Sequence, residues 1–490
     1  MSVVAPTRGT AVVAVGTAIT LIASAIGFAR AMTMPASMPG MTGEPPVSRL
    51  HGMPLSEMPE MFVAAVGILL VLSAAPWHPA RRPVAADALS RRRTGLVAVV
   101  ATAALTIDIS KTSTLGFVIP GMREEYGISP GTASLLAVAG LTGTAAGALL
   151  VGRLADRYGR RRCYLIATLG FTATSMCGCM PTFAGNVVMC LLMGVAVGGL
   201  APLLVTLLAD VFGTRVRGPA VVALSVVATA IGYLVAAGSA LWLEPVFGWR
   251  ILWLIGAPTG LVLVAVTFLV PERAPSAAPV APAARTAVAR STLSTGLQRV
   301  YAALTGILTF GLTTWVPTLS RADGLPAGTA NALLTAAALA MVPCAVLLAW
   351  CYRRFGPVPI CLGLAVLTAT MLFALTFSGV ADGAAWVSAG ALVASLFAVN
   401  TMAAVFLPVA ADLAESGRRA GVAGNISFCN RLGGLAGPLV LAALVASVSD
   451  VLVAVAVLAL CSGLLSWYIG RRHRTATAGK SALLPEKAPL

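Results

Sequence analysis

Long apolar runs separated by short polar segments follow one another along the whole chain. About 20 mainly apolar residues are needed for one helix to cross a bilayer. Fourteen runs approach or exceed this length, which predicts an all-α polytopic membrane protein. They are residues 9–29, 61–77, 95–119, 131–151, 163–183, 186–210, 219–241, 250–270, 297–318, 328–350, 358–379, 385–410, 420–444 and 449–469.

Arginines gather in the short segments that connect these runs, for example at 91–93, 160–162, 353–354 and 471–472. Short basic loops mark the cytoplasmic side of a membrane protein. With an even number of spans both termini lie on one side, and every basic cluster then falls on that side. We therefore expect both termini to be cytoplasmic, in a multi-pass protein of the plasma membrane of the cell.

Composition supports this interpretation: 58% of the 490 residues are hydrophobic, 10% are charged, and the mean hydropathy is +0.92. Soluble domains carry about 25% charged residues. The net charge of +16 reflects the loop arginines, which also attract anionic lipid headgroups. No basic patch interleaved with aromatic residues occurs, so the sequence predicts the lipid bilayer as a partner and no nucleic acid.

Motifs for a metal, a cofactor or an enzyme are missing from the sequence. The three histidines lie outside the apolar runs, and most of the nine cysteines lie within them as small apolar residues. No Walker-type phosphate loop, H-E-x-x-H or G-x-S-x-G pattern occurs. We expect no cofactor, no metal and no enzymatic activity.

The first 94 residues raise two open questions. The run 9–29 is either a retained helix, which we favour, or a cleaved signal peptide, because Ala29-Arg30-Ala31 mimics a cleavage site. The segment 32–61 contains seven methionines and His51, and lacks a helical period. It is interpreted as a flexible outer loop, with a Cu(I)-capturing loop as the alternative because thioethers suit that ion.

A motif of glycines and charges connects the runs 131–151 and 163–183. It reads Gly152-Arg153-Leu154-Ala155-Asp156-Arg157-Tyr158-Gly159-Arg160-Arg161-Arg162. This G-x-x-x-D-R-x-G-R-R-R pattern resembles the signature loop between the second and third helices of the major facilitator superfamily of secondary transporters. A basic stop-transfer cluster, the alternative, requires arginines but neither the glycines nor the aspartate.

The resemblance implies two six-helix halves at 95–270 and 296–470, joined by a cytoplasmic linker at 271–295 and followed by a tail at 471–490. Residues 1–94 then add two helices that the common twelve-helix pattern lacks. In the family the loop carboxylate and its neighbours hold one conformation of the gate. The implied gate residues are Gly152, Asp156, Arg157, Gly159, Arg160, Arg161, Asp210 and Arg217.

The two halves also resemble each other. Arg353-Arg354-Phe355-Gly356 occupies the place of Asp156-Arg157-Tyr158-Gly159 in the second half, without the acidic residue. We therefore expect the contact made by Asp156 to be asymmetric, and the substrate site to lie where the two halves meet.

Ionisable residues inside apolar runs are costly and are candidates for function. Asp108 and Lys111 are three residues apart in the run 95–119 and face one side of a helix, where they form either a proton or substrate site or a structural ion pair. Arg431 offers a planar fork for a carboxylate, for a substrate or for Asp108. Asn400 and Asn430 complete the candidate substrate or proton site, and Tyr233 and Trp315 are further candidates for its lining.

The surplus positive charge of Asp108, Lys111 and Arg431 favours an anionic solute. The glycine-rich segment 193–202 resembles the organic-acid and aromatic-acid proton symporter branch of the family, which usually carries several acidic residues where Asp108 stands alone. We expect a monomeric proton-coupled symporter of a small organic anion. The alternatives are proton-coupled efflux of a drug or metabolite, and a sensor or scaffold that no longer transports.

Overall fold

The computed structural model contains helices and their connections throughout the part of the chain that it describes, and no strand within that part. This confirms the all-α fold. The structure describes residues 8–33, 50, 52–53, 55–74, 91–212, 217–270, 295–312, 327–377, 385–412, 419–444 and 448–481. The linker, the tail beyond 481, Trp315 and most of the methionine-rich segment, His51 included, lie outside these residues.

Each predicted apolar run coincides with helical residues. Those before the linker are α1 (Arg8–Thr33), α2 (Pro59–Ala74), α3 (Arg91–Tyr126), α4 (Pro130–Tyr158), α5 (Arg160–Thr174) continued by the 3-10 turn η2 (Ser175–Cys179), α6 (Phe183–Gly198), α7 (Leu200–Val211), α8 (Arg217–Trp242), α9 (Glu244–Phe247), α10 (Ile251–Leu254), α11 (Gly256–Ala265) and η3 (Val266–Leu269), with a further short turn η1 (Leu55–Glu57).

The helices after the linker begin with helical residues 295–312. They continue with α13 (Ala327–Phe355), α14 (Pro357–Phe377), α15 (Ala385–Asp412), α16 (Arg419–Leu444) and α17 (Val448–Ser481). Among the described residues, nine helices are long and apolar enough to cross a membrane, and two shorter apolar helices, Pro59–Ala74 and Ala394–Phe406, accompany them. The count of fourteen spans stays a prediction.

Two of the predicted runs are broken rather than continuous. The run 186–210 divides at Gly199 into α6 and α7, and the run 250–270 divides at Ile255 into α10 and α11. Pro202 and Pro258 lie just after these breaks. Because proline has no N–H to donate to the carbonyl four residues earlier, each favours a break at that place.

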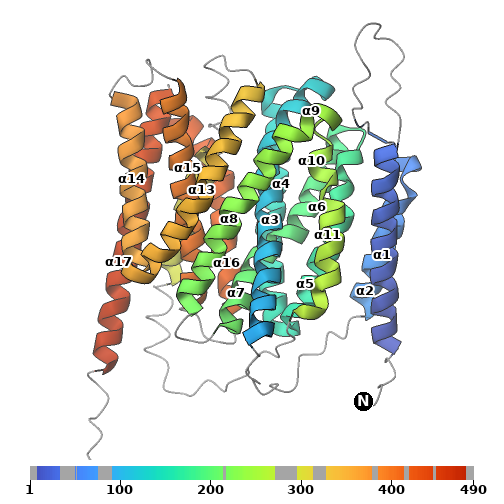
Figure 1. The fold of residues 1–490 in the computed structure, drawn as a ribbon, viewed down its shortest axis with the longest axis horizontal. Coiled ribbons are helices and arrows are strands. Elements are labelled where there is room, and N and C mark those ends of the chain that lie inside the picture. Colours follow the sequence, from blue (N-terminus) through green and yellow to red (C-terminus); the bar gives the residue numbers. More distant parts are fainter. Residues whose placement is uncertain are drawn as a thin grey trace, which may run out of the picture.

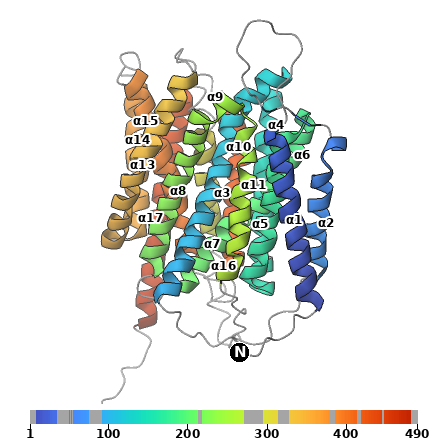
Figure 2. The same cartoon turned by 45° about the vertical axis from the view of Figure 1, so that its right-hand side comes forward.

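The helices stand side by side as one bundle, in which α1 and α2 form an edge (Figure 1). Figure 2 shows the same pair beside α5 and α11. The α4–α5 turn, the beginning of α1 and the end of α17 lie at one end of the bundle, called here the basic end because the arginine clusters 160–162, 353–354 and 471–472 are there. This common placement of the two helix ends agrees with an even number of crossings.

The α1 and α2 helices pack closely against each other as a hairpin. Thr20 donates a hydrogen bond to the Ala64 carbonyl oxygen at 3.3 Å, and Gly16 and Gly67 approach so closely that a Cβ on Gly16 would lie 2.6 Å from the Gly67 oxygen. At the opposite end of the hairpin, Arg30 pairs with Glu60. Hydrogen bonds within such a pair replace the hydrophobic effect, which is absent between helices in lipid.

The segment before α2 is attached to the end of the bundle opposite the basic end. The backbone N–H groups of Leu50 and Met53 donate to the carbonyl oxygens of Phe247 and Cys179 at 3.0 and 2.8 Å. Met53 and Met58 are buried in the hydrophobic core. These two methionines therefore pack as core residues rather than form part of an open loop.

Arg250 organises the same end of the bundle. Its fully buried guanidinium donates to the carbonyl oxygens of Gly178 and Met180 at 2.8 and 2.9 Å, and pairs with Glu125. The Trp249 indole N–H donates to the other Glu125 oxygen at 2.8 Å. Trp249 and Arg250 thus tie the start of α10 to α3 and η2.

Glycines bring α4 and α6 into backbone contact. A Cβ added to Gly143 would lie 2.2 Å from the Leu191 carbonyl oxygen, and one added to Gly198 would lie 2.2 Å from the Thr144 oxygen. Small residues on both helices allow close approach and dispersion contacts along the crossing. The crossing of α4 and α6 is therefore a packing seam within one chain.

Replacing Gly143 with valine should force α4 and α6 apart, because the new side chain meets backbone that has nowhere to move. Overpacking of a core by a few methyl groups costs about 1–3 kcal/mol. We expect a clear loss of thermal stability of the detergent-solubilised protein, measured by the midpoint of its unfolding or aggregation. Gly363→Val in α14 is the matched control, since a Cβ there meets nothing within 4 Å. An equal loss of thermal stability in both variants would contradict the close packing of α4 against α6.

Candidate functional site

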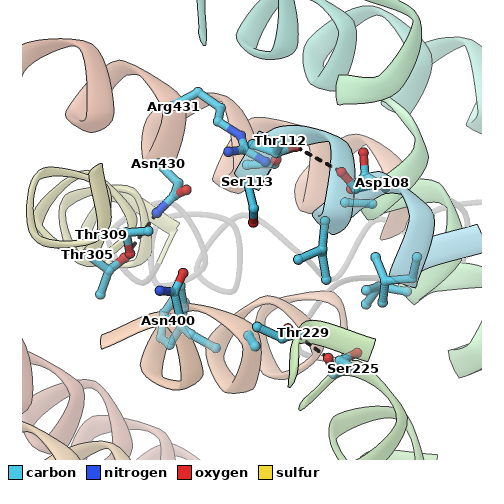
Figure 3. A pocket seen from close by; sticks show the side chains of 18 of the residues that line it. Asp108, Thr112, Ser113, Ser225, Thr229, Thr305, Thr309, Asn400, Asn430 and Arg431 are labelled. Carbon is cyan, nitrogen blue, oxygen red and sulfur yellow. Dashed lines mark hydrogen bonds between the residues drawn. The ribbon is translucent and has the colours of Figure 1, made fainter. Parts of the chain in front are cut away.

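A central cavity lies between the two halves of the bundle. Its lining comes from α3, α7 and α8 of the N-terminal half and from helix 295–312, α13, α15 and α16 of the C-terminal half. The centre of a water molecule can occupy about 180 Å³ of it. Figure 3 shows its polar side chains converging from opposite walls. Such a cavity can hold a small organic molecule.

The cavity has one acidic and one basic side chain among its lining residues. Asp108 on α3 is 2% exposed, and its Oδ1 atom has no hydrogen-bond partner. Arg431 on α16 enters the cavity from the other half, and its guanidinium carbon lies 5.2 Å from the centre of the Phe310 ring. The two charges therefore face one interior space from different halves (Figure 3).

The glycine run of α16 positions this arginine and its aromatic partner. A Cβ on Gly434 would lie 2.3 Å from Phe310, and a Cβ on Gly433 would lie 2.0 Å from the Ala303 carbonyl oxygen. Helix 295–312 and α16 are thus in backbone contact, and the Phe310 ring lies against Gly434. The sequence shows this glycine run, but its role in placing Phe310 beneath Arg431 depends on the tertiary structure.

Two amides complete the wall of the C-terminal half. Asn430 donates through Nδ2 to the Ala302 carbonyl oxygen at 3.1 Å and to Thr305 Oγ1 at 3.3 Å. Asn400 donates through Nδ2 to the Leu396 carbonyl oxygen of its own helix at 2.9 Å. Both line the cavity together with Tyr233 of α8. The structure thus brings together four of the five predicted substrate or proton residues.

Lys111, the fifth, lies elsewhere. Its ammonium group donates to the Leu252 carbonyl oxygen of α10 at 2.8 Å, and it is not among the residues that line the central cavity. The ion pair with Asp108 that their spacing allowed does not form. The long lysine side chain reaches across the helix interface to α10, where the backbone is interrupted and a carbonyl oxygen is accessible. The cavity therefore holds one positive and one negative side chain, without the surplus positive charge expected from the sequence.

The loop aspartate joins the two halves at the basic end. Asp156 accepts hydrogen bonds from the backbone N–H groups of Ala420 at 3.2 Å and Gly421 at 2.6 Å, in the first turn of α16. The first N–H groups of a helix have no partner within the helix, and the helix dipole favours a negative charge there. Asp156 thus caps a helix of the other half, which is a contact that the sequence did not specify.

Gly152 permits this contact. A Cβ on Gly152 would lie 2.7 Å from the Ala420 carbonyl oxygen, and one on Gly424 would lie 2.5 Å from the Ala148 oxygen. The crossing of α4 and α16 is therefore a backbone contact. In the present conformation the two halves meet closely at the basic end.

The turn after α4 requires a glycine and has a counterpart in the second half. Gly159 has φ 98° and its N–H donates to the Ala155 oxygen, while Gly356 has φ 82° and donates to the Tyr352 oxygen. Positive φ is strained for residues that carry a Cβ. The same turn thus follows α4 and α13, in agreement with the predicted internal repeat.

The remaining gate residues differ in their surroundings. Arg160 is 6% exposed and donates to the Thr206 carbonyl oxygen, which holds α5 against α7. Arg157 is exposed and lies over the neighbouring Tyr158 ring, and Arg161 is partly buried. The side chains of Asp210 and Arg217 lie outside the described part of the chain, so their predicted role stays a prediction.

Several lining residues carried no signal in the sequence. Thr112, Ser225, Thr229, Thr305 and Phe310 all face the cavity. Serine, threonine and phenylalanine are ordinary in membrane helices, where a serine or threonine hydroxyl can bond to the backbone of its own helix. Only the placement of seven helix segments around one space distinguishes these residues from others of the same type.

The family model of the Major Facilitator Superfamily matches residues 100–438 of this chain. This match includes the signature loop, the central cavity and both halves. The chain belongs to the Major Facilitator Superfamily.

Curated relatives of known name match parts of the chain. The gallate transporter of Pseudomonas putida is 33% identical over 208 residues, which are 40% of this chain and 44% of that protein. The niacin transporter NiaP and the 4-hydroxybenzoate transporter PcaK of Acinetobacter baylyi are each 30% identical, over 34% and 37% of this chain. These alignments span 38% and 40% of the two relatives, less than half of their length.

Solved structures share the fold. The human organic anion transporter MFSD10 (TETRAN) matches with a TM-score of 0.61 at 20% identity, covering 77% of this chain and 99% of that chain. The xylose transporter XylE of E. coli, in a partially occluded inward open conformation, matches with a TM-score of 0.60 at 16% identity, covering 77% and 98%. At these identities the likeness concerns the fold alone.

Replacing Asp156 with alanine should loosen the basic end, because two hydrogen bonds to a charged group are lost. Each such bond contributes about 1.5–3 kcal/mol, and about 1.4 kcal/mol changes a population ratio tenfold. We expect the population with α4 and α16 separated to rise at least tenfold, measured by distances between spin labels on these two helices in nanodiscs.

Arg157→Ala is the control for this prediction. It removes a charge next to Asp156 from an exposed position without touching α16. A similar change in both variants, or none in Asp156→Ala, would show that the capping contact does not hold the two halves together.

Proposed function

We propose that this protein is a secondary transporter, not an enzyme, that carries a small organic anion together with a proton by alternating access. The observation that carries the proposal is the central cavity, in which Asp108 of one half and Arg431 of the other face a common space. A site between two halves that can move against each other is what alternating access requires. The curated relatives, named as transporters of gallate, niacin and 4-hydroxybenzoate, support this solute class.

The substrate carboxylate binds to Arg431. A guanidinium presents two parallel N–H donors that match the two oxygens of a carboxylate. The Phe310 ring beneath Arg431 fixes the plane of the guanidinium and offers an apolar surface next to it. A flat aromatic or unsaturated acid fits this combination of a charged fork and an apolar face.

The proton binds to Asp108. In the empty cavity, Arg431 is the charge that balances this carboxylate. A bound anion neutralises Arg431, and a buried carboxylate without a balancing charge or hydrogen-bond donors then takes up a proton. The loaded cavity is thereby neutral, so no net charge is buried in it while the two halves rock. Anion and proton are coupled because the anion occupies Arg431, and Asp108 then lacks the charge that balanced it.

The Asp156 contact acts as the gate. It stabilises the conformation that is closed at the basic end, and it must break when the halves rock so that the cavity opens there. Since basic loops face the cytoplasm, this is the cytoplasmic gate, in a plasma membrane protein with both termini inside. The transport unit is one chain, because the cavity is formed entirely by one copy.

Asp108→Asn should abolish proton-driven accumulation, because the amide cannot exchange a proton. Proteoliposomes with an inwardly directed proton gradient and radiolabelled 4-hydroxybenzoate measure this uptake. Counterflow of substrate at equal pH needs no net proton movement, and it should continue in the variant at a measurable rate. Accumulation at the rate of the unaltered protein would remove Asp108 from the coupling.

Arg431→Lys should weaken anion binding about tenfold or more, because a point charge replaces a bidentate fork. The dissociation constant is measured by calorimetry in nanodiscs. Arg299→Lys, at an exposed position of the helix that faces α16, is the control for the same exchange. Unchanged affinity in Arg431→Lys would leave Arg431 with a structural role only.

Proton movement in response to substrates tests the proposal as a whole. Addition of an organic acid should alkalinise the medium outside proteoliposomes that contain the protein. A proton signal with cationic compounds alone would favour efflux of such compounds instead. No signal with either class, from folded protein, would contradict secondary transport.

A further inference from the structure

One corner of the basic end gathers charged and aromatic side chains that the proposed function does not use. The last turn of α13 carries Arg353 and Arg354, and α17 carries Arg471 and Arg472 where its apolar part ends. All four arginines are exposed. Figure 1 shows α13, α14 and α17 together on the side of the bundle away from α1 and α2.

The packing of α17 against the start of α14 brings the two arginine pairs together. A Cβ added to Gly470 would lie 2.4 Å from the Val358 side chain, so the two residues are in direct contact. Gly470 immediately precedes one pair, and Val358 follows the other pair by four residues, across the turn at Gly356. The backbone segments that carry the two pairs are therefore neighbours, although more than 100 positions separate them in the sequence.

Both pairs lie at the ends of apolar spans, at one level of the bundle. The apolar part of α13 ends at Phe355, that of α14 begins at Pro357, and that of α17 ends at Arg472. Four exposed aromatic side chains lie close to these ends, namely Trp350, Phe355, Trp467 and Tyr468. Tryptophan and tyrosine gather where the hydrocarbon of a bilayer meets the headgroups. The arginines consequently lie at the depth of the phospholipid phosphates.

Two of the arginines stack on aromatic rings of their own helix. The guanidinium carbon of Arg471 lies 4.9 Å from the centre of the Trp467 ring, and that of Arg472 lies 5.1 Å from the centre of the Tyr468 ring. A stacked guanidinium keeps the N–H donors at its edge, where they can bind phosphate oxygens in pairs. Stacking also restricts the side chain before a ligand arrives, which lowers the entropic cost of binding.

The turn between α13 and α14 is the counterpart of the α4–α5 turn, with the opposite charge. Where Asp156 stands in the first half, the second half has Arg353. The start of a helix favours a carboxylate and disfavours a guanidinium. The second turn therefore cannot repeat the capping contact of the first, and its charge is instead suited to an anion outside the protein.

We propose that this corner is a binding site for one anionic phospholipid of the leaflet at the basic end. The lipid phosphate binds between the pairs 353–354 and 471–472, and the acyl chains lie along exposed apolar side chains of α14 and α17 such as Leu367 and Leu464. Basic pockets between helices are known to bind such headgroups. Two pairs from separate helices and two stacked rings define one place, which general attraction between loop arginines and a negative membrane does not. The site is independent of the solute that the protein carries.

The test is a measurement of lipid binding to the full-length protein in detergent by native mass spectrometry. The probes are phosphatidylglycerol, which is anionic, and phosphatidylcholine, which is zwitterionic, with identical acyl chains. One phosphatidylglycerol should bind with an apparent dissociation constant at least tenfold lower than that of phosphatidylcholine. Equal binding of the two lipids would overturn the proposal. This comparison uses the unaltered protein, so it does not depend on the folding of a variant.

Two double variants test the location of the site. Arg353→Gln/Arg354→Gln and Arg471→Gln/Arg472→Gln should each weaken phosphatidylglycerol binding at least fivefold, because each removes one of the two pairs of donors, and leave phosphatidylcholine binding within twofold. Weakening by only one of these double variants would overturn a site shared between α13 and α17.

The matched control is Arg92→Gln/Arg153→Gln. It removes the same two charges from exposed positions of α3 and α4 in the other half. Binding of both lipids should stay within twofold of that of the unaltered protein. An equal loss of phosphatidylglycerol binding in this control would show attraction to the overall positive charge instead of a site, and would overturn the proposal.

Discussion

Close approach of helix backbones at glycines is the constraint on which this structure depends. In lipid no hydrophobic effect draws helices together, so packing and hydrogen bonds must do so. Gly143 and Gly198 join α4 to α6, Gly152 and Gly424 join α4 to α16, and Gly433 joins α16 to helix 295–312. The contacts of α16 serve both halves, since it meets α4 on one side and its own half on the other.

Buried polar groups follow the same constraint, because an apolar surrounding makes each unpaired group costly. Arg160, Arg250 and Lys111 all end on backbone carbonyl oxygens of another helix element. They hold broken or neighbouring segments of the N-terminal half in place. Asp108 differs, since it lines the central cavity and its Oδ1 atom has no hydrogen-bond partner.

The α16 helix connects the Asp156 contact with the central cavity. Its first turn is capped by Asp156 at Ala420 and Gly421, and ten residues later it carries Asn430 and Arg431 into the cavity. A movement of α16 that releases the cap therefore also moves the side chains with which this helix lines the cavity. Conversely, a ligand that pulls on Arg431 acts on the capped end.

The sequence by itself determined the helical fold, the family loop and the presence of costly charges at Asp108 and Arg431, because these depend on local hydropathy and on residue types that lipid penalises. It also located Asn400 and Asn430, though not the direction of their amides. The tertiary structure decided the side-chain partners. Lys111 bonds to α10 and not to Asp108, Asp156 bonds to the first turn of α16, and Phe310 lies against Arg431. Side-chain partners depend on which helices lie next to each other, and residues more than 100 positions apart carry no local signal of their contact.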